Sequence, residues 1–178
     1  MCGCRRAWRR SVLLSFQAAA VKSGRGMRVG VAPQRYTVTL EADVFTARQA
    51  AERLALSEGY PRLVAQEVAL ITSELAWNIL RHGGGGAIEL EAVIDPVHGP
   101  GVEIQACDGA PPIADLALAQ RDGHTAGGPI PAHVMLTRRG IGSGLGAVAR
   151  LGDRLEQLPR ETGKCLVVTR FLRRPRPA

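Results

Sequence analysis

The spacing of hydrophobic positions changes along this chain, and each change predicts an element of secondary structure. Short apolar runs, several of them alternating with polar residues, indicate strands with one buried face. These strands are expected over residues 36–40, 87–94, 101–108, 154–158 and 165–172. Helices are expected over residues 44–57, 61–81, 113–121 and 144–151. In the second of these, apolar residues recur every three or four positions, which is typical of one buried helical stripe.

Turn-forming residues separate these elements and help to define the fold class. Asp43 is a suitable N-cap for the first helix, Pro61 suits the first turn of the second, and a run of glycines over 83–86 ends it. Residues 122–142 form a long loop with little pattern, which is typical of a functional lid or of disorder. Strands and helices do not alternate strictly, so we expect an α+β two-layer sandwich with helices on one face of the sheet.

The net charge of +7 is distributed unevenly along the 178 residues. Residues 1–35 carry eight basic residues and no acid, residues 170–178 carry four more, and the middle holds eleven bases against 16 acids. We expect a basic, disordered extension over 1–35, a folded domain over 36–172 and a basic tail over 173–178. The basic ends carry few aromatic residues among their arginines, so nucleic acid is not an expected partner. No apolar run approaches the roughly 18 residues of a membrane span.

The N-terminal segment imitates a signal peptide, because a basic start precedes a mostly apolar run. Gln17 interrupts that run and no clear cleavage site follows, so we expect no export. Translation from Met27 is an alternative, since the patterned sequence begins soon after it.

The cysteines at positions 2, 4, 107 and 165 show no zinc-finger spacing, and the histidines show no metal-ligand spacing. Cys107 and Cys165 lie inside apolar runs, where a free cysteine packs as a small hydrophobic residue. We therefore expect reduced thiols, no zinc site and a cytoplasmic protein.

Candidate chemistry begins with Glu74, Asn78 and His82, which recur every four residues on one side of the second helix. A buried stripe through Ile71, Leu75 and Ile79 runs beside them, so the polar row lies along the edge of the core. A carboxylate there can act as a general base, and an amide one turn later can ligate Mg²⁺ through oxygen. The alternative is a solvated helix face.

Two further segments carry candidate chemistry. Glycines alternate over residues 140–146 before a helix, and this exposes backbone N–H groups that can cradle phosphate. The alternative there is a flexible linker. Asp108 ends an apolar strand and enters a tight turn, so its carboxylate can accept a hydrogen bond from the exocyclic amine of adenine. The alternative for Asp108 is an ordinary helix N-terminal turn.

The order and spacing of these three segments resemble the GHKL ATPase superfamily, whose members include gyrase and the histidine kinases. The matching residues run from Ser73-Glu74-Leu75-Ala76 and Asn78 through Asp108 to Gly142-x-Gly144-Leu145-Gly146. Within that superfamily the chain looks most like the small anti-sigma-factor and switch-protein serine/threonine kinases. The resemblance implies a Bergerat-type fold with a mixed, mainly antiparallel sheet.

The resemblance also implies roles for particular residues. Glu74 is the catalytic residue that orients or deprotonates an acceptor hydroxyl, Asn78 holds Mg²⁺ between the ATP phosphates, and Asp108 reads adenine. The implied nucleotide-binding residues are Asn78, Asp108, Ala110, Ile113, Thr125, Gly140, Gly142, Ser143, Gly144, Leu145 and Gly146. The implied acceptor is a serine or threonine on an anti-anti-sigma (STAS-domain) protein, and a sigma factor or a PP2C-type phosphatase is a further candidate partner.

Two departures from the family pattern keep alternatives open. Ala110 and Pro112 stand where the family has glycines at the adenine turn, and Cys165 stands where it has a hydroxyl residue. One alternative is therefore a non-catalytic module of the same fold that sequesters a partner protein. Another is a detached histidine-kinase catalytic domain, which we rank lower because only some 40 residues precede the domain.

Overall fold

The computed structural model describes residues 22–23, 26–28, 32–120, 124–125, 128–129 and 144–172. The strands are β1 (Lys22–Ser23), β2 (Gly26–Arg28), β3 (Gln34–Val38), β4 (Gly86–Asp95), β5 (Gly99–Asp108), β6 (His124–Thr125), β7 (Gly128–Pro129), β8 (Arg154–Leu158) and β9 (Lys164–Phe171). The helices are α2 (Glu41–Ser57), α3 (Arg62–Asn78), the π-helical turn η2 (Ile79–Gly83), α4 (Leu116–Ala119) and α6 (Gly144–Leu151).

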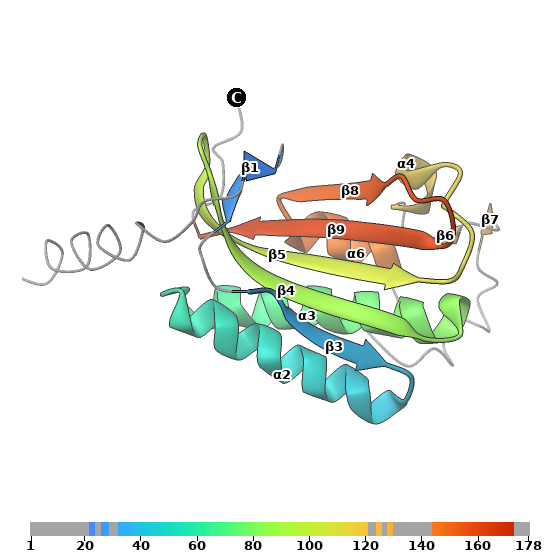
Figure 1. The fold of residues 1–178 in the computed structure, drawn as a ribbon, viewed down its shortest axis with the longest axis horizontal. Helices are drawn as coiled ribbons and strands as arrows, with labels where there is room; N and C mark the ends of the chain where they lie inside the picture. Colours follow the sequence, from blue (N-terminus) through green and yellow to red (C-terminus); the bar gives the residue numbers. More distant parts are fainter. Residues whose placement is uncertain are drawn as a thin grey trace, which may run out of the picture.

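A seven-stranded sheet carries its helices on one face, as Figure 1 shows. The strand order is β1-β2-β4-β5-β9-β8, and β3 pairs with β4. β2 and β3 pair with different stretches of β4, on the side away from β5. All pairings in this sheet are antiparallel. The expected α+β two-layer sandwich is therefore confirmed.

The alternation of the strands places every second residue in the interface with the helices. Ile88, Ile104 and Val168 are completely buried there, and each lies in register beside a buried apolar residue of a neighbouring strand. From the helical layer, Val68, Ile71 and Leu75 of α3 project into the same core. The buried side of α2 consists largely of alanines, which let this helix pack closely against α3.

Several element boundaries differ from those expected. α2 begins at Glu41, with Leu40 as its N-cap, so the prediction that Asp43 is the N-cap is wrong. Asp43 acts instead from the first turn, where its carboxylate accepts hydrogen bonds from the Thr39 and Leu40 N–H groups at 2.9 and 2.8 Å. These bonds lower the pKa of Asp43. They also end β3 two residues earlier than expected.

Other differences arise from pairings between distant segments. β1 and β2 lie within the segment expected to be a disordered extension, yet β2 pairs with the end of β4. The helix expected over 113–121 is reduced to α4, and β6 and β7 pair within the segment expected to be a loop. The stretches expected over 144–151 and 154–158 form α6 and β8 with those bounds.

The stretch Arg62–Gly83, which comprises α3 and η2, is long and apolar enough to cross a membrane, with a mean hydropathy of 1.2. Half of it is buried inside the fold, as in the core helix of a soluble protein. In the fold, α3 contacts α2 and α6 as well as β4 and β5.

Arg170 forms a buried ionic cluster between the two layers. Its guanidinium, with 4% of the side chain exposed, donates to Glu67 of α3 at 2.9 Å and to Asp153 at 2.8 Å. Asp153 also accepts from the Phe171 N–H, and the Tyr60 hydroxyl donates to the Arg170 carbonyl oxygen. Burial raises the pKa of Tyr60, so this hydroxyl keeps its proton.

A second polar cluster holds the opposite face of the sheet together. Asp95 accepts hydrogen bonds from the Val97 and His98 N–H groups and from the guanidinium of Arg154 on β8. Burial alone would raise the pKa of Asp95, but these hydrogen bonds lower it to about 2. Asp95 therefore stays ionised throughout the neutral pH range and links the β4–β5 turn to the far edge strand.

Replacing Arg170 by methionine should lower the free energy of unfolding by about 3–5 kcal/mol, because Glu67 and Asp153 lose the buried cation that both contact. Urea denaturation followed by circular dichroism measures the change. The exposed Arg53 on α2 supplies a matched control, since Arg53→Met should change stability by less than about 0.5 kcal/mol. Equal stability of the two variants would contradict a structural role for the cluster.

Candidate functional site

The predicted polar row runs along the C-terminal half of α3 and passes from the core to the surface. Glu74 is only 3% exposed, Asn78 is half-buried and His82 is exposed. Asn78 is the last residue of the α-helix, and the chain continues through η2 to Gly84, whose φ of +66° ends the helical segment. The wider π turn carries His82, so the regular α-helical row extends only as far as Asn78.

Glu74 and Asn78 differ in their surroundings in a way that suits different tasks. The carboxylate of Glu74 is buried, as are the neighbouring core side chains of Ile71 and Leu75. The Asn78 amide is partly open, and no residue within the described part of the chain forms a hydrogen bond with it. Such an amide is available to an incoming ligand, whereas the carboxylate is shielded from bulk water.

Asp108 ends β5 and lies next to the end of the helical segment that carries Asn78. A Cβ atom added to Gly83 would meet the Asp108 Cβ at 2.4 Å, and one added to Gly163 would meet the Asp108 carbonyl oxygen at 2.2 Å. Only glycine fits at these two positions. The glycines therefore bring η2 and the β8–β9 turn into direct contact with Asp108.

Lys164 faces Asp108 directly, because the two residues are register partners on β9 and β5. The Lys164 ammonium lies 2.8 Å from each carboxylate oxygen of Asp108, and the two side chains are 6% and 2% exposed. The sequence analysis missed this ion pair. The only sign of this ion pair in the sequence is a lysine at the start of one apolar strand and an aspartate at the end of another. The sequence does not show that these two strands are neighbours.

The turn after Asp108 is fixed by two further sets of hydrogen bonds. The Asp108 carboxylate accepts from the Ala110 N–H at 2.8 Å. The Gln157 amide on β8 accepts from the Ile113 N–H at 2.8 Å and donates to the Ile113 carbonyl oxygen at 3.2 Å. Ala110 and Ile113 are therefore held in place near Asp108, and Gln157 is a positioning residue that the sequence pattern did not indicate.

The glycine-rich segment is described only from Gly144 onward. Gly144 starts α6 with a φ of +50° and has open space where a side chain would lie, Leu145 packs against the core, and Gly146 is buried. α6 contacts α3, the helix that carries the polar row. Gly140, Gly142 and Ser143 lie outside the described residues, and for Thr125 only the backbone pairing of β6 is described.

Comparison with known proteins agrees with this arrangement. Residues 37–170 match the family model of the histidine kinase-like ATPase domain. The chain belongs to this family. It is also 32% identical over 116 residues to the serine/threonine-protein kinase RsbT of Bacillus subtilis, an alignment that covers 65% of this chain and 78% of RsbT.

The carboxylate of Asp108 is nearly saturated with contacts from within the fold. A carboxylate offers about four lone-pair positions. The Lys164 ammonium and the Ala110 N–H occupy three of them, which leaves one position on Oδ2 for an adenine amine. Adenine recognition by Asp108 stays a prediction, and the ion pair restricts its geometry.

The residues present fit a magnesium–nucleotide complex rather than a metal ion alone. No group of three or more potential metal ligands occurs among the residues that the structure describes. Mg²⁺ in nucleotide sites needs few protein ligands, because phosphate oxygens and water complete its octahedral shell. The accessible amide of Asn78 would be sufficient as the side-chain ligand.

Replacing Asp108 by asparagine should destabilise the fold by about 3–5 kcal/mol, because the ammonium of Lys164 would be left buried without its counter-charge. The double variant Asp108→Asn/Lys164→Met should recover most of that loss, since it removes both charges. Urea unfolding of the two variants and the parent measures the coupling between the residues. If the double variant is less stable than Asp108→Asn alone, the ion pair does not dominate this region.

Proposed function

We propose that the protein is a cytoplasmic, ATP-dependent serine/threonine protein kinase of the anti-sigma regulatory type. Its substrate would be a serine or threonine on a STAS-domain protein, and phosphorylation would change what that partner binds. A sigma factor or a PP2C-type phosphatase is a further candidate partner of the same pathway. Family membership and the similarity to a serine/threonine-protein kinase support this proposal.

One observation carries the proposal: the buried carboxylate of Glu74 lies one helical turn before the Asn78 amide, which forms no hydrogen bond with any residue in the described part of the chain. The Asn78 amide is partly exposed, so its oxygen is accessible to a metal–nucleotide ligand. The alternative for this row is a solvated helix face. It does not fit, because Glu74 is only 3% exposed.

In the proposed reaction, Glu74 accepts the proton of the acceptor hydroxyl as the oxygen attacks the γ-phosphorus of ATP. The bond between that phosphorus and the β,γ-bridging oxygen breaks, and ADP leaves. Because Glu74 is shielded from water, its carboxylate has few competing hydrogen bonds with solvent, and its role is one of proton transfer and orientation.

Asn78 and the start of α6 would bind the nucleotide. Mg²⁺, when bound, would neutralise phosphate charge and align the γ-phosphoryl group. The Asn78 amide oxygen would hold that ion, and backbone N–H groups near Gly144 and Gly146 would donate to phosphate oxygens. Gly144 suits this task because its positive φ turns the chain into α6 without a side chain over the N-terminus.

A second candidate function is a nucleotide-independent module of the same fold that sequesters a partner protein. The occupied carboxylate of Asp108 favours it, because Lys164 competes with adenine for the same acceptor. Ala110 and Pro112, at positions where glycine would let the backbone approach the base, favour it too. Binding of magnesium–ATP to the parent protein decides between the two functions.

Isothermal titration calorimetry should detect magnesium-dependent ATP binding to the parent protein, and Asn78→Ala should weaken it by about tenfold or more because a metal ligand is lost. Gln66→Ala is a matched control, since it removes an exposed amide from the same helix. Circular dichroism should be unchanged in both variants. An absence of binding to the parent at millimolar ATP would leave only the sequestering module.

Replacing Glu74 by glutamine should reduce phosphoryl transfer to a STAS-domain protein by roughly 10²–10⁴-fold, because glutamine keeps the shape but accepts no proton. ATP affinity should change little, since the carboxylate faces the acceptor. Single-turnover transfer from labelled ATP measures the step, with Glu52→Gln on α2 as the control. Transfer at the parent rate by Glu74→Gln would refute the catalytic role of this residue.

A further inference from the structure

Cys107 and Cys165 form a disulfide between the neighbouring strands β5 and β9, with their Cα atoms 4.1 Å apart. The expectation of two free thiols is therefore wrong. Strand pairing is the physical reason, because it makes the two residues direct register partners. Both side chains lie on the helix-free face of the sheet, since their neighbours Ala106 and Leu166 point into the core.

Cys107 of this disulfide lines a cavity of about 290 Å³ on the helix-free face. Cys107 lines the cavity together with residues of β3, β4 and the turn after β5. Cys165 is only 2% exposed and is not among the lining residues. An incoming molecule can therefore reach the bond from the Cys107 side.

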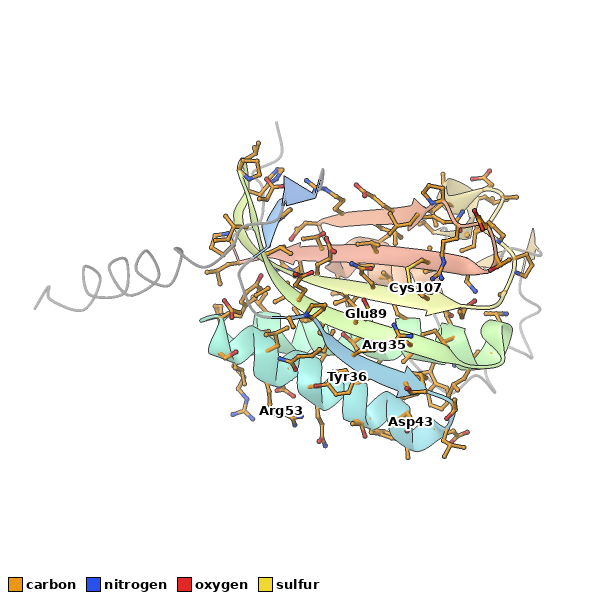
Figure 2. All side chains as sticks on the ribbon, viewed as in Figure 1. Arg35, Tyr36, Asp43, Arg53, Glu89 and Cys107 are labelled. Carbon is orange, nitrogen blue, oxygen red and sulfur yellow. A yellow bond between two sulfur atoms is a disulfide. The ribbon has the colours of Figure 1, made fainter. Side chains whose placement is uncertain are left out.

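Two arginines line the same cavity, Arg35 from β3 and Arg160 from the β8–β9 turn. Arg35 contacts Glu89 through one terminal nitrogen, and Figure 2 shows this pair on neighbouring strands beside the strand of Cys107. A guanidinium has five N–H donors, so Arg35 retains donors for another anion. The Arg160 side chain is exposed and forms no ion pair within the described residues.

We propose that the Cys107–Cys165 disulfide is a thiol–disulfide exchange site, which takes small thiols bearing carboxylate groups through the cavity between Arg35 and Arg160. The arginines attract the carboxylates and the cavity admits the thiol to the accessible sulfur of Cys107. The exchange at the disulfide does not require the proposed kinase activity, although Asp108 and Gly109 next to the candidate nucleotide site line the same cavity.

The exchange balances with two thiol molecules per disulfide. The first thiolate attacks Cys107 Sγ, an external S–S bond forms, the Cys107–Cys165 bond breaks, and the Cys165 thiolate takes up a proton. The second thiolate attacks the external sulfur of this mixed disulfide and releases Cys107 as a thiolate, which is protonated. The products are the protein dithiol and the small-molecule disulfide, and the reverse sequence re-forms the protein disulfide.

The rate of reduction by glutathione, which carries two carboxylates, tests the role of the cavity. The parent protein for this test carries Cys2→Ser and Cys4→Ser, so that the measured reduction comes from the Cys107–Cys165 disulfide alone. In this background, Arg35→Ala/Arg160→Ala should slow reduction by glutathione about three- to tenfold, because two attracting charges are removed. Reduction by the neutral thiol 2-mercaptoethanol should change less than twofold. Arg53→Ala on α2, at the other face, is the matched control for both thiols.

Single-cysteine variants give an independent measurement. With glutathione disulfide, the Cys165→Ser variant should form a mixed disulfide at Cys107. The Cys107→Ser variant should react at least about tenfold more slowly, because Cys165 is buried. Mass spectrometry detects the adduct, and circular dichroism confirms that both variants fold. Equal labelling of the two variants would overturn the proposal. The same conclusion would follow from equal effects of the arginine substitutions on both thiols, or from failure of the two thiols to pair in oxidised glutathione buffer.

Discussion

The buried guanidinium of Arg170 is the interaction on which the arrangement of the two layers depends. It lies on the core side of β9, next to the apolar residues Leu166 and Val168, and it contacts acids from α3 and from the segment after α6. Apolar side chains can slide past one another at small cost, but a guanidinium hydrogen-bonded to two carboxylates restricts the geometry far more. The cluster therefore determines both the position and the rotation of α3 on the sheet.

That rotation has a direct effect on the candidate site. Glu67, which Arg170 holds, precedes Glu74 by seven residues, or about two helical turns, so both carboxylates lie on nearly the same side of α3. When Glu67 is held against the sheet, Glu74 is buried about 10 Å further along the same helix. The burial of the proposed general base is thus a consequence of an ion pair two turns away.

Local sequence patterns predicted the layer architecture and most elements, because alternation and 3.6-residue periodicity arise from which face of each element is buried. β8 and α6 have the expected bounds for this reason. The Asp108–Lys164 pair, the Cys107–Cys165 bond and the Gln157–Ile113 hydrogen bonds could not be predicted. Each joins residues more than 40 positions apart, and each depends on the register between strands that the pattern of a single strand does not determine. The same holds for β2, which pairs with the distant end of β4.

The π-helical turn η2 constrains how the length of this chain can vary during evolution. A π turn closes i→i+5 hydrogen bonds and so contains one residue more than an α-helical turn would. Deleting a single residue between Asn78 and Gly84 would leave both Asn78 and the sheet in place. It would, however, rotate the following residues and withdraw Gly83 from Asp108, where no side chain fits. Insertions and deletions should therefore be excluded from these five positions, even though a glycine-rich helix end would otherwise tolerate them.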